Sequence, residues 1–101
     1  MKKILLAVVF TVVSFFAFAI PSGCYEGTSR INRDRCAILI QGDELNITNR
    51  DGDVIVRWKI VSDNNGKLTL RSEAGATASA TWWKEDGNVY LNFNYETFTR
   101  R

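Results

Sequence analysis

From residue 35 onward the sequence runs in short stretches of alternating apolar and polar residues, each ending at turn-forming residues. These turn signals are Gly42-Asp43, Asp51-Gly52, Asn65-Gly66, Ala74-Gly75-Ala76 and Asp86-Gly87. Gly, Asn and Asp tolerate the positive φ angles of tight hairpins, and a period of two places alternate side chains on one face of a strand. The pattern therefore predicts consecutive antiparallel strands.

The hairpin over residues 54–70 is the centre of this arrangement. A two-residue turn at its tip would pair Val61 with Leu70 and leave Ile60 on the wrong face of the sheet. A three-residue loop over 64–66 pairs Ile60 with Leu70 instead, so the apolar pattern favours the longer loop.

The same reasoning sets the other registers, with two-residue turns at 42–43, 51–52 and 86–87 and a three-residue link at 74–76. The predicted pairs are Ile38/Ile47, Ile40/Leu45, Ile47/Val56, Leu45/Trp58, Leu70/Ala80, Leu68/Trp82, Trp82/Leu91, Ala80/Phe93 and Ala78/Tyr95. All of these side chains, together with Val54 and Val89, fall on a single inner face.

No helical period is present after the first 19 residues, so this inner face has no helix to cover it. The sheet must then curl over itself. The predicted fold is all-β, a small antiparallel up-and-down barrel or strongly rolled meander of six or seven strands. Pairing of residues 89–98 with a weak strand over 25–31 would close it.

Residues 1–19 have the features of a signal peptide. Lys2 and Lys3 precede an apolar run that ends in the small-x-small site Ala17-Phe18-Ala19. This predicts export, in a bacterial manner, to the periplasm or the medium, and a single domain over residues 20–101. The leader holds two of the 13 basic residues, which leaves 11 against 11 acidic residues. A neutral chain gives no reason to expect a nucleic-acid partner.

Two cysteines admit two interpretations. In an oxidising compartment Cys24 and Cys36 can form a disulfide. Alternatively Gly23-Cys24 ends a lipoprotein leader of residues 1–23, and Cys24 carries a lipid anchor in the outer membrane. Pro21 stands where such leaders have an aliphatic residue, which favours the soluble form. If residues 25–31 pair as a hairpin with 35–41, the two cysteines lie too far apart to bridge, so this hairpin and the disulfide exclude each other.

The chain lacks the residues of common catalytic and metal sites. It has no histidine, no closely spaced cysteine pair and no phosphate-binding glycine loop. Glu44 and Glu96 are expected to point outward, into water, where nothing would raise their pKa. We therefore expect a protein that is not an enzyme and that needs no cofactor or metal.

The outer face carries a candidate binding surface. The predicted register sets Trp83 opposite both Tyr90 and Lys67, with Lys59 and Arg71 one row away. Exposed aromatics beside basic residues are typical of interaction hot spots, although cross-strand aromatic pairs also stabilise sheets. The expected partner is a protein or a glycan of the cell envelope. This aromatic and basic surface would make the protein a binding or inhibitory module.

A carrier of the lipocalin type is an alternative that would use the inside of the barrel. Trp58, Trp82, Phe93 and Tyr95 are all expected there, and so much side-chain volume predicts a filled interior. An apolar cavity of about 300 Å³ or more would favour the carrier instead.

One stretch resembles a known family. The segments Ser72-Glu73-Ala74-Gly75-Ala76 and 82–91 are similar to part of the membrane-bound or periplasmic inhibitors of C-type lysozyme. The resemblance implies a small exported bacterial β-barrel whose Ser-Gly-Ala and Trp-x-Lys-Gly segments enter the lysozyme cleft. Ala74 replaces the serine of the family, Thr77-Ala78 replaces its basic-Tyr pair, and Lys84 lies early relative to the following glycine. Lys84 is the residue that the resemblance carries over.

Overall fold

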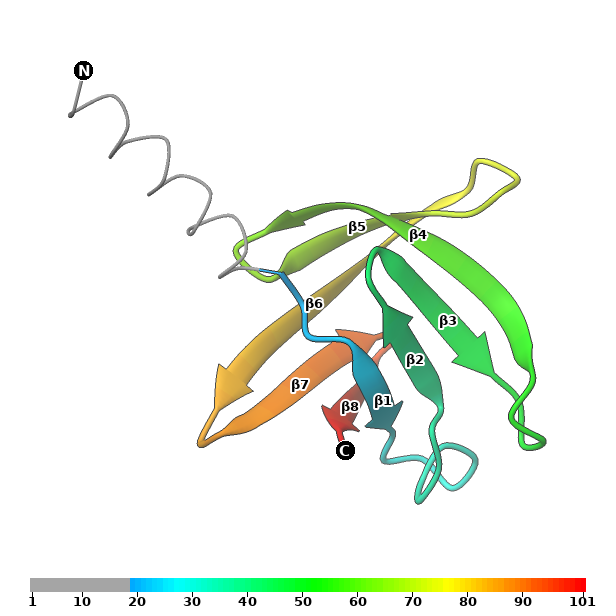
Figure 1. Cartoon of the computed structure of the whole chain (residues 1–101), viewed down its shortest axis with the longest axis vertical. Coiled ribbons are helices and arrows are strands. Elements are labelled where there is room, and N and C mark those ends of the chain that lie inside the picture. Colours follow the sequence, from blue (N-terminus) through cyan, green and yellow to red (C-terminus); the bar gives the residue numbers. More distant parts are fainter. Residues whose placement is uncertain (1–18) are drawn as a thin grey trace.

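The computed structural model of this protein describes residues 19–101, so the predicted leader lies outside the described residues except for Ala19. Eight antiparallel strands follow one another in sequence order and close into a barrel (Figure 1). They are β1 (Gly23–Glu26), β2 (Ile38–Gln41), β3 (Glu44–Thr48), β4 (Val54–Asn64), β5 (Lys67–Arg71), β6 (Thr77–Glu85), β7 (Asn88–Phe93) and β8 (Glu96–Arg100). The all-β barrel is confirmed, with eight strands where six or seven were predicted. In the described range no helix is long and apolar enough to cross a membrane.

The additional strand is β8. The expected single strand over 89–98 turns back at Asn94 and Tyr95, which have φ angles of 54° and 64°. Neither residue is glycine, and Tyr rarely adopts such angles, so the sequence gives no clear sign of this turn. The barrel closes where β8 meets β1, with Tyr25 opposite Arg100.

The first strand is shorter than expected and lies earlier in the chain. β1 ends at Glu26, and the segment 27–37 is a loop in which Ile31 is 58% exposed. This resolves the conflict between the first hairpin and the disulfide. Only the residues around Cys24 pair with β2, and the loop returns Cys36 to a Cα–Cα distance of 5.0 Å from Cys24, where the two form a disulfide.

Most of the predicted strand pairs are confirmed. They are Ile38/Ile47, Ile40/Leu45, Ile47/Val56, Leu45/Trp58, Ile60/Leu70 and Trp82/Leu91. The β5–β6 register is wrong by two residues, since Leu70 lies opposite Ala78 and Leu68 opposite Ala80. A shift of two keeps the same face inside, so the apolar pattern could not detect it. The predicted partners of Phe93 and Tyr95 are also wrong, because β7 leaves β6 after Asn92.

Two β-bulges in β4 allow the pairs above to form although the turns on either side of this strand differ in length from the predicted ones. The β3–β4 loop is one residue longer than predicted, and the register shifts back at Ile55. The β4–β5 turn is the two-residue Asn65-Gly66 turn, one residue shorter than predicted, and the register shifts at Val61. A β-bulge absorbs one extra residue and bends its strand, so β4 passes from one side of the barrel to the other.

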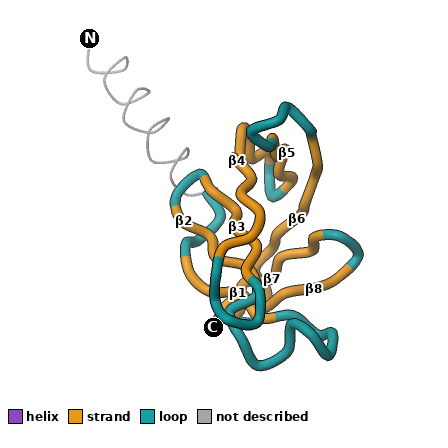
Figure 2. The backbone as a smooth tube through the Cα atoms, turned by 90° about the vertical axis from the view of Figure 1, so that its right-hand side faces the viewer, coloured by secondary structure: helices purple, strands orange, loops and turns teal. Residues whose placement is uncertain are grey.

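The core fills only part of the barrel. Seven apolar or aromatic side chains are almost wholly buried, namely Tyr25, Ile38, Ile40, Leu45, Leu68, Leu70 and Leu91. Ala80 and Val89 are buried as well, but six other members of the predicted inner face are only partly buried, namely Ile47, Trp58, Ile60, Ala78, Trp82 and Phe93. Most of them lie where β4 and the start of β6 stand apart from β7 and β8 (Figure 2). Two further residues of the predicted inner face are not part of this core. They are Val54, which lies opposite Thr48 after the β3–β4 loop, and Tyr95, which lies in the β7–β8 turn. The interior is therefore packed on one side and open on the other.

Candidate functional site

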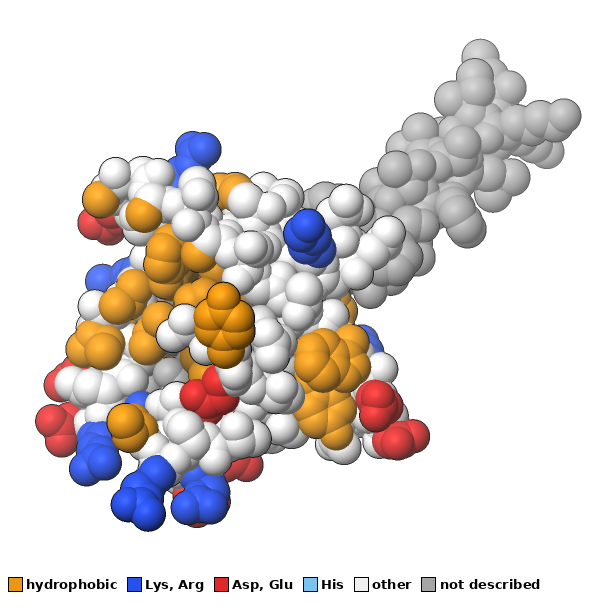
Figure 3. Space-filling model, turned by 180° about the vertical axis from the view of Figure 1, so that it is seen from behind, with side chains coloured by type: hydrophobic (Ala, Val, Ile, Leu, Met, Phe, Trp, Pro, Cys, Tyr) orange, Lys and Arg blue, Asp and Glu red, His pale blue; other side chains and the backbone are white. Residues whose placement is uncertain are grey.

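An apolar cleft of about 540 Å³ lies on the open side of the barrel. Its walls come from β3 and β4 on one side and from β6, β7 and the β7–β8 turn on the other. The lining residues are Ile47, Val56, Trp58, Ala78, Ser79, Asn92, Phe93, Asn94 and Tyr95. Hydrophobic side chains gather in a hollow on this face of the molecule (Figure 3). The volume lies in the range of about 300–1,000 Å³ that is usual for ligand sites. The interior is therefore filled on the side of the core and not on the side of this cleft.

The cleft exists because two long strands are each paired along only part of one edge. Residues 54–58 of β4 pair with β3, and β5 joins β4 only from Lys59 onward. Residues 77–80 of β6 pair with β5, and β7 joins β6 only from Thr81 onward. The sheet is therefore continuous around the barrel but splayed where these two segments face each other.

Trp58 and Phe93 join the two walls of the cleft. Their ring centroids are 6.5 Å apart with an interplanar angle of 71°, an edge-to-face contact. Trp58 is partly exposed, and its indole Nε1 is buried with no hydrogen-bond partner among residues 19–101. A buried indole N–H normally finds a partner, so Trp58 is less well satisfied than a core tryptophan.

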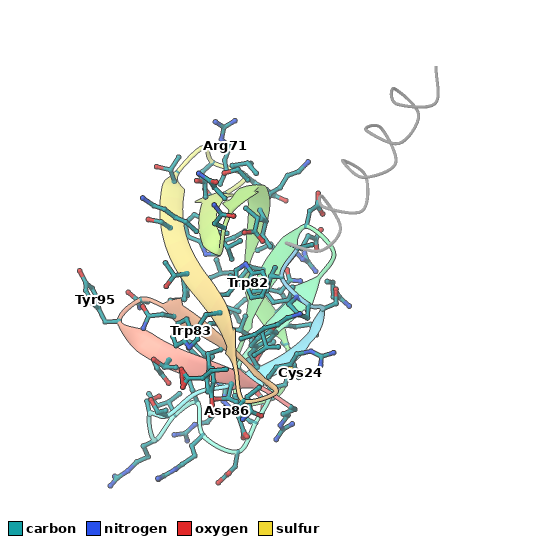
Figure 4. The ribbon with its side chains drawn as sticks, turned by 90° about the vertical axis from the view of Figure 1, so that its left-hand side faces the viewer. Cys24, Arg71, Trp82, Trp83, Asp86 and Tyr95 are labelled. Atoms are coloured by element: carbon teal, nitrogen blue, oxygen red, sulfur yellow. A yellow bond between two sulfur atoms is a disulfide. The ribbon has the colours of Figure 1, made fainter. Side chains whose placement is uncertain are left out.

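Tyr95 stands at the edge of the cleft with its whole side chain in water, at 101% relative exposure. It projects from the turn away from the sheet (Figure 4). Its φ of 64° costs a tyrosine on the order of 1–3 kcal/mol, which glycine at this position would avoid. An exposed aromatic held at such an angle beside an apolar cleft is a candidate binding residue that sequence reasoning placed in the core.

A second, smaller groove of about 280 Å³ shares Trp58 with the cleft and is ionic. Three cations and three anions line it, namely Arg57, Lys59, Arg71, Asp43, Glu44 and Glu73. Lys59 Nζ lies 4.0 Å from an oxygen of Asp43, and both side chains are largely exposed. Such a pair contributes little to stability, so the groups of this groove stay available to a partner.

The structure divides the predicted outer surface into two parts. Lys59 and Arg71 are directly opposite each other, and Arg71 faces Thr77 at the start of β6. Trp83 is six residues further along β6, about 20 Å away. Figure 4 shows this separation, with Arg71 at the opposite end of β6 from Trp83. Lys67 lies opposite Thr81, not opposite Trp83 as predicted.

The aromatic half of that surface is a compact pair. Trp83 and Tyr90 lie opposite each other, with ring centroids 5.6 Å apart and an interplanar angle of 25°. Trp83 remains 37% exposed. Thr81 lies two residues before Trp83 on β6, and Thr99 lies opposite Tyr90 on β8. Two carboxylates border the same face, since Glu85 is two residues beyond Trp83 and Glu26 lies opposite Thr99.

Lys84, the residue carried over from the lysozyme inhibitors, is exposed on β6 opposite Val89, beside the Asp86-Gly87 turn. Ala74 lies in the loop at the other end of the same strand. Across residues 19–101, no group of three or more carboxylates and cysteines is placed to hold a metal ion.

Glu96 points into the barrel end, not outward as predicted. Its carboxylate accepts hydrogen bonds from the backbone N–H groups of Thr28 (2.9 Å) and Ser29 (3.0 Å) and from Nδ2 of Asn32 (3.0 Å). Burial alone would raise the pKa of Glu96, but these hydrogen bonds outweigh it and lower the pKa below its ordinary value. Glu96 thus fixes the loop that closes this end of the barrel.

Arg35 holds the same loop from the other side. Its guanidinium donates to the backbone oxygens of Ile31 (2.7 Å) and Asn49 (2.8 Å), to Oγ1 of Thr48 (3.1 Å) and to Oδ1 of Asn32 (2.9 Å). A guanidinium used in this way is structural, so Arg35 and Glu96 together fix the loop over this end of the barrel, where a pocket of about 100 Å³ remains beside the larger cleft.

Comparison with protein-family models, with characterised proteins and with solved structures gives no match for this chain.

Proposed function

We propose that this protein is a small exported binding module of the bacterial cell envelope, and that its ligand places an apolar group in the cleft between β4 and β6. The observation that supports this most is the cleft itself, with about 540 Å³ lined by six aromatic and aliphatic residues and by the uncharged polar residues Ser79, Asn92 and Asn94. Burying apolar surface there would contribute about 25 cal/mol per Å². No charged residue lines this cleft, so the buried part of the ligand is uncharged.

A pair of neighbouring residues tests this site. Val56 lines the cleft and is 37% exposed, whereas Ile55 lies at the adjacent bulge, is 60% exposed and does not line the cleft. Val56→Trp should fill the cleft, and Ile55→Trp adds the same side chain outside it. The probe is N-phenyl-1-naphthylamine, an uncharged dye that fluoresces in apolar surroundings.

The wild type and the Ile55→Trp variant should show saturable fluorescence, and the Val56→Trp variant should lose it. Circular dichroism of each variant establishes that the barrel is folded. Absence of binding to the wild type, or equal binding by both folded variants, would contradict the proposed site.

The exposed pair Trp83 and Tyr90 is a second candidate site, for an envelope protein or a glycan. The observation in its favour is the 37% exposure of Trp83 on a face of hydroxyl-bearing residues. If the pair is a hot spot, Trp83→Ala should weaken capture of a partner from envelope extract by at least about 2 kcal/mol while leaving folding intact. The Val56→Trp variant is the matched control. Unfolding of Trp83→Ala, or capture of the same partners, would make the pair structural.

Inhibition of lysozyme is the third candidate and rests on Lys84. A turbidity assay with C-type lysozyme compares the wild type with Lys84→Ala, with Lys67→Ala as the control. Full lysozyme activity in the presence of the wild type would exclude it.

We further propose that the mature chain begins at Ile20 and is soluble. Three contacts of residues 20–22 support this start. Ile20 packs in the core, the backbone oxygen of Pro21 accepts the hydroxyl hydrogen bond of Tyr25 (2.7 Å), and Oγ of Ser22 accepts the backbone N–H of Gly42 (3.1 Å). A lipoprotein starting at Cys24 would lose all three, and its sulfur could not also form the disulfide. Intact mass of the exported protein distinguishes the two forms.

A further inference from the structure

The first half of β4 offers an unpaired edge beside the cleft. β4 runs over Val54–Asn64, but among residues 19–101 its segment 54–58 pairs only with β3. Backbone N–H and C=O groups on the other edge of this segment have no strand to bond. A strand edge of this kind is a template for another extended chain.

Apolar side chains accompany this edge. Ile55 is 60% exposed and Val56 is 37% exposed, and Trp58 is partly exposed as well. Val56 and Trp58 face the cleft, so a chain lying along the edge would have its inward side chains in the same apolar space. The segment 77–80 of β6 is on the opposite wall, and its Ala78 and Ser79 are small enough to leave room.

Basic side chains beside the free edge of β4 indicate which kind of polypeptide would bind there. Arg57 is exposed on the segment, and Lys59 follows it. Neither Arg57 nor Arg71, which lines the adjacent groove, forms an ion pair with any residue of the described chain. A second copy of this protein pairing antiparallel along the same edge, in the register centred on residue 57, would set two Arg57 side chains opposite each other, which is destabilising. An acidic side chain opposite Arg57 would be favourable.

We infer that the occupant of the cleft is an extended segment of a partner protein that pairs with β4 at residues 54–58, with apolar side chains facing inward and acidic side chains facing Arg57. This inference rests on the proposed function and names its ligand. The added strand lies about 4.8 Å from β4, and its side chains alternate between the two faces. Backbone hydrogen bonds to β4 supply affinity, and the cleft and Arg57 supply selectivity.

The first step of the test is selection of short linear peptides from a random displayed library on the wild-type protein. The expected result is enrichment of sequences that alternate between apolar and acidic residues with a period of two. One selected peptide is then synthesised in two forms. Each form carries backbone N-methyl groups on every second residue, in opposite registers.

Only one N-methylated form should lose affinity, by about tenfold or more, because only alternate amides face β4. The Arg57→Glu variant should bind the unmodified peptide with an affinity reduced to a similar extent. The same variant should bind more tightly a peptide in which lysine replaces the acidic residues. Arg33→Glu, the same charge change in the exposed 27–37 loop, is the matched control and should leave the affinity unchanged.

Four results would overturn the inference. The first is that the selected peptides show no alternation of apolar and acidic residues, and the second is that both N-methylated forms bind equally well. The third is that Arg57→Glu leaves the affinity for the peptide unchanged. The fourth is self-association of the protein that Val56→Trp abolishes, because this would assign the edge to a second copy. If any of these occurs while the uncharged dye still binds in a manner that depends on Val56, the proposed function stands and only the identity of the ligand is wrong.

Discussion

The indole nitrogen of Trp82 donates a hydrogen bond of 2.9 Å to a carboxylate oxygen of Asp63 inside the barrel. The other carboxylate oxygen accepts the backbone N–H of Gly66 at 3.1 Å. Asp63 lies opposite Leu68, on the inner face, because the bulge at Val61 reverses the alternation of β4. One irregularity of the strand thus supplies a partner for a tryptophan and fixes the β4–β5 turn at the same time.

Removing this carboxylate should destabilise the barrel. Asp63→Ala leaves the indole N–H of Trp82 without its partner, and hydrogen bonds to charged groups contribute about 1.5–3 kcal/mol. We expect the free energy of unfolding in urea at neutral pH to fall by about 2–3 kcal/mol. Asp53→Ala is the control, since the exposed side chain of Asp53 forms no hydrogen bond among residues 19–101. An equal effect of both variants would contradict the assigned role.

Acid should weaken the closed end of the barrel through Glu96. Its folded pKa lies below the ordinary value of 4.5, so its contribution to stability is present above that pH and is lost as the pH falls through the folded pKa. Urea unfolding and amide exchange of Thr28 and Ser29 at neutral and low pH measure this. Glu96→Gln should remove this part of the pH dependence, whereas the exposed Glu44→Gln should not.

Loss of the disulfide should be costly for a domain of this size. Cys24 and Cys36 are separated by 12 positions, and closing a loop of this length stabilises by about 3 kcal/mol in the chain-entropy model. Replacement of both cysteines by alanine should lower the free energy of unfolding by about 2–3 kcal/mol. The bridge itself is detected as a mass about 2 Da below the dithiol form. Free thiols in the exported protein would contradict it.

Hydrogen exchange should divide β4 into two parts. Residues 54–58, the first part, have one free edge, whereas Lys59 and Ile60 lie between β3 or its turn and β5. Alternate amides of the first part should therefore exchange as fast as those of surface loops, and Leu91, on a strand between β6 and β8, should be among the slowest. Uniform protection along β4 would show that the edge is covered.

Truncation of Trp58 should cost less than truncation of a core residue. A filled barrel would predict a loss of about 3–5 kcal/mol for Trp58→Ala, but its side chain borders an open cleft and is partly exposed. Leu91→Ala, at a fully buried position, should cost about 2–5 kcal/mol and serves as the comparison. A larger loss for Trp58 than for Leu91 would mean that the cleft closes in solution.

The sequence by itself determined which side chains face each other in the middle of most hairpins. Alternation of period two fixes which side chains share a face where a strand is regular, and a slip of one residue would expose a whole apolar set. Pairs such as Ile60/Leu70 and Trp82/Leu91 therefore follow from the pattern. A slip of two carries no such penalty, and the pairing of Leu70 with Ala78 was therefore missed.

Tertiary structure decided the turns, the bulges and the site. The lengths of the loops around β4 differ from the predicted ones by one residue each, and bulges at Ile55 and Val61 restore the pairs that burial demands. The turn at Asn94 and Tyr95 has no glycine, so β8 could not be predicted. In the closed barrel, β4 and β6 each lack a partner strand along about half of one edge. The cleft between them results from how the strands meet in space, and the local sequence pattern does not encode that arrangement.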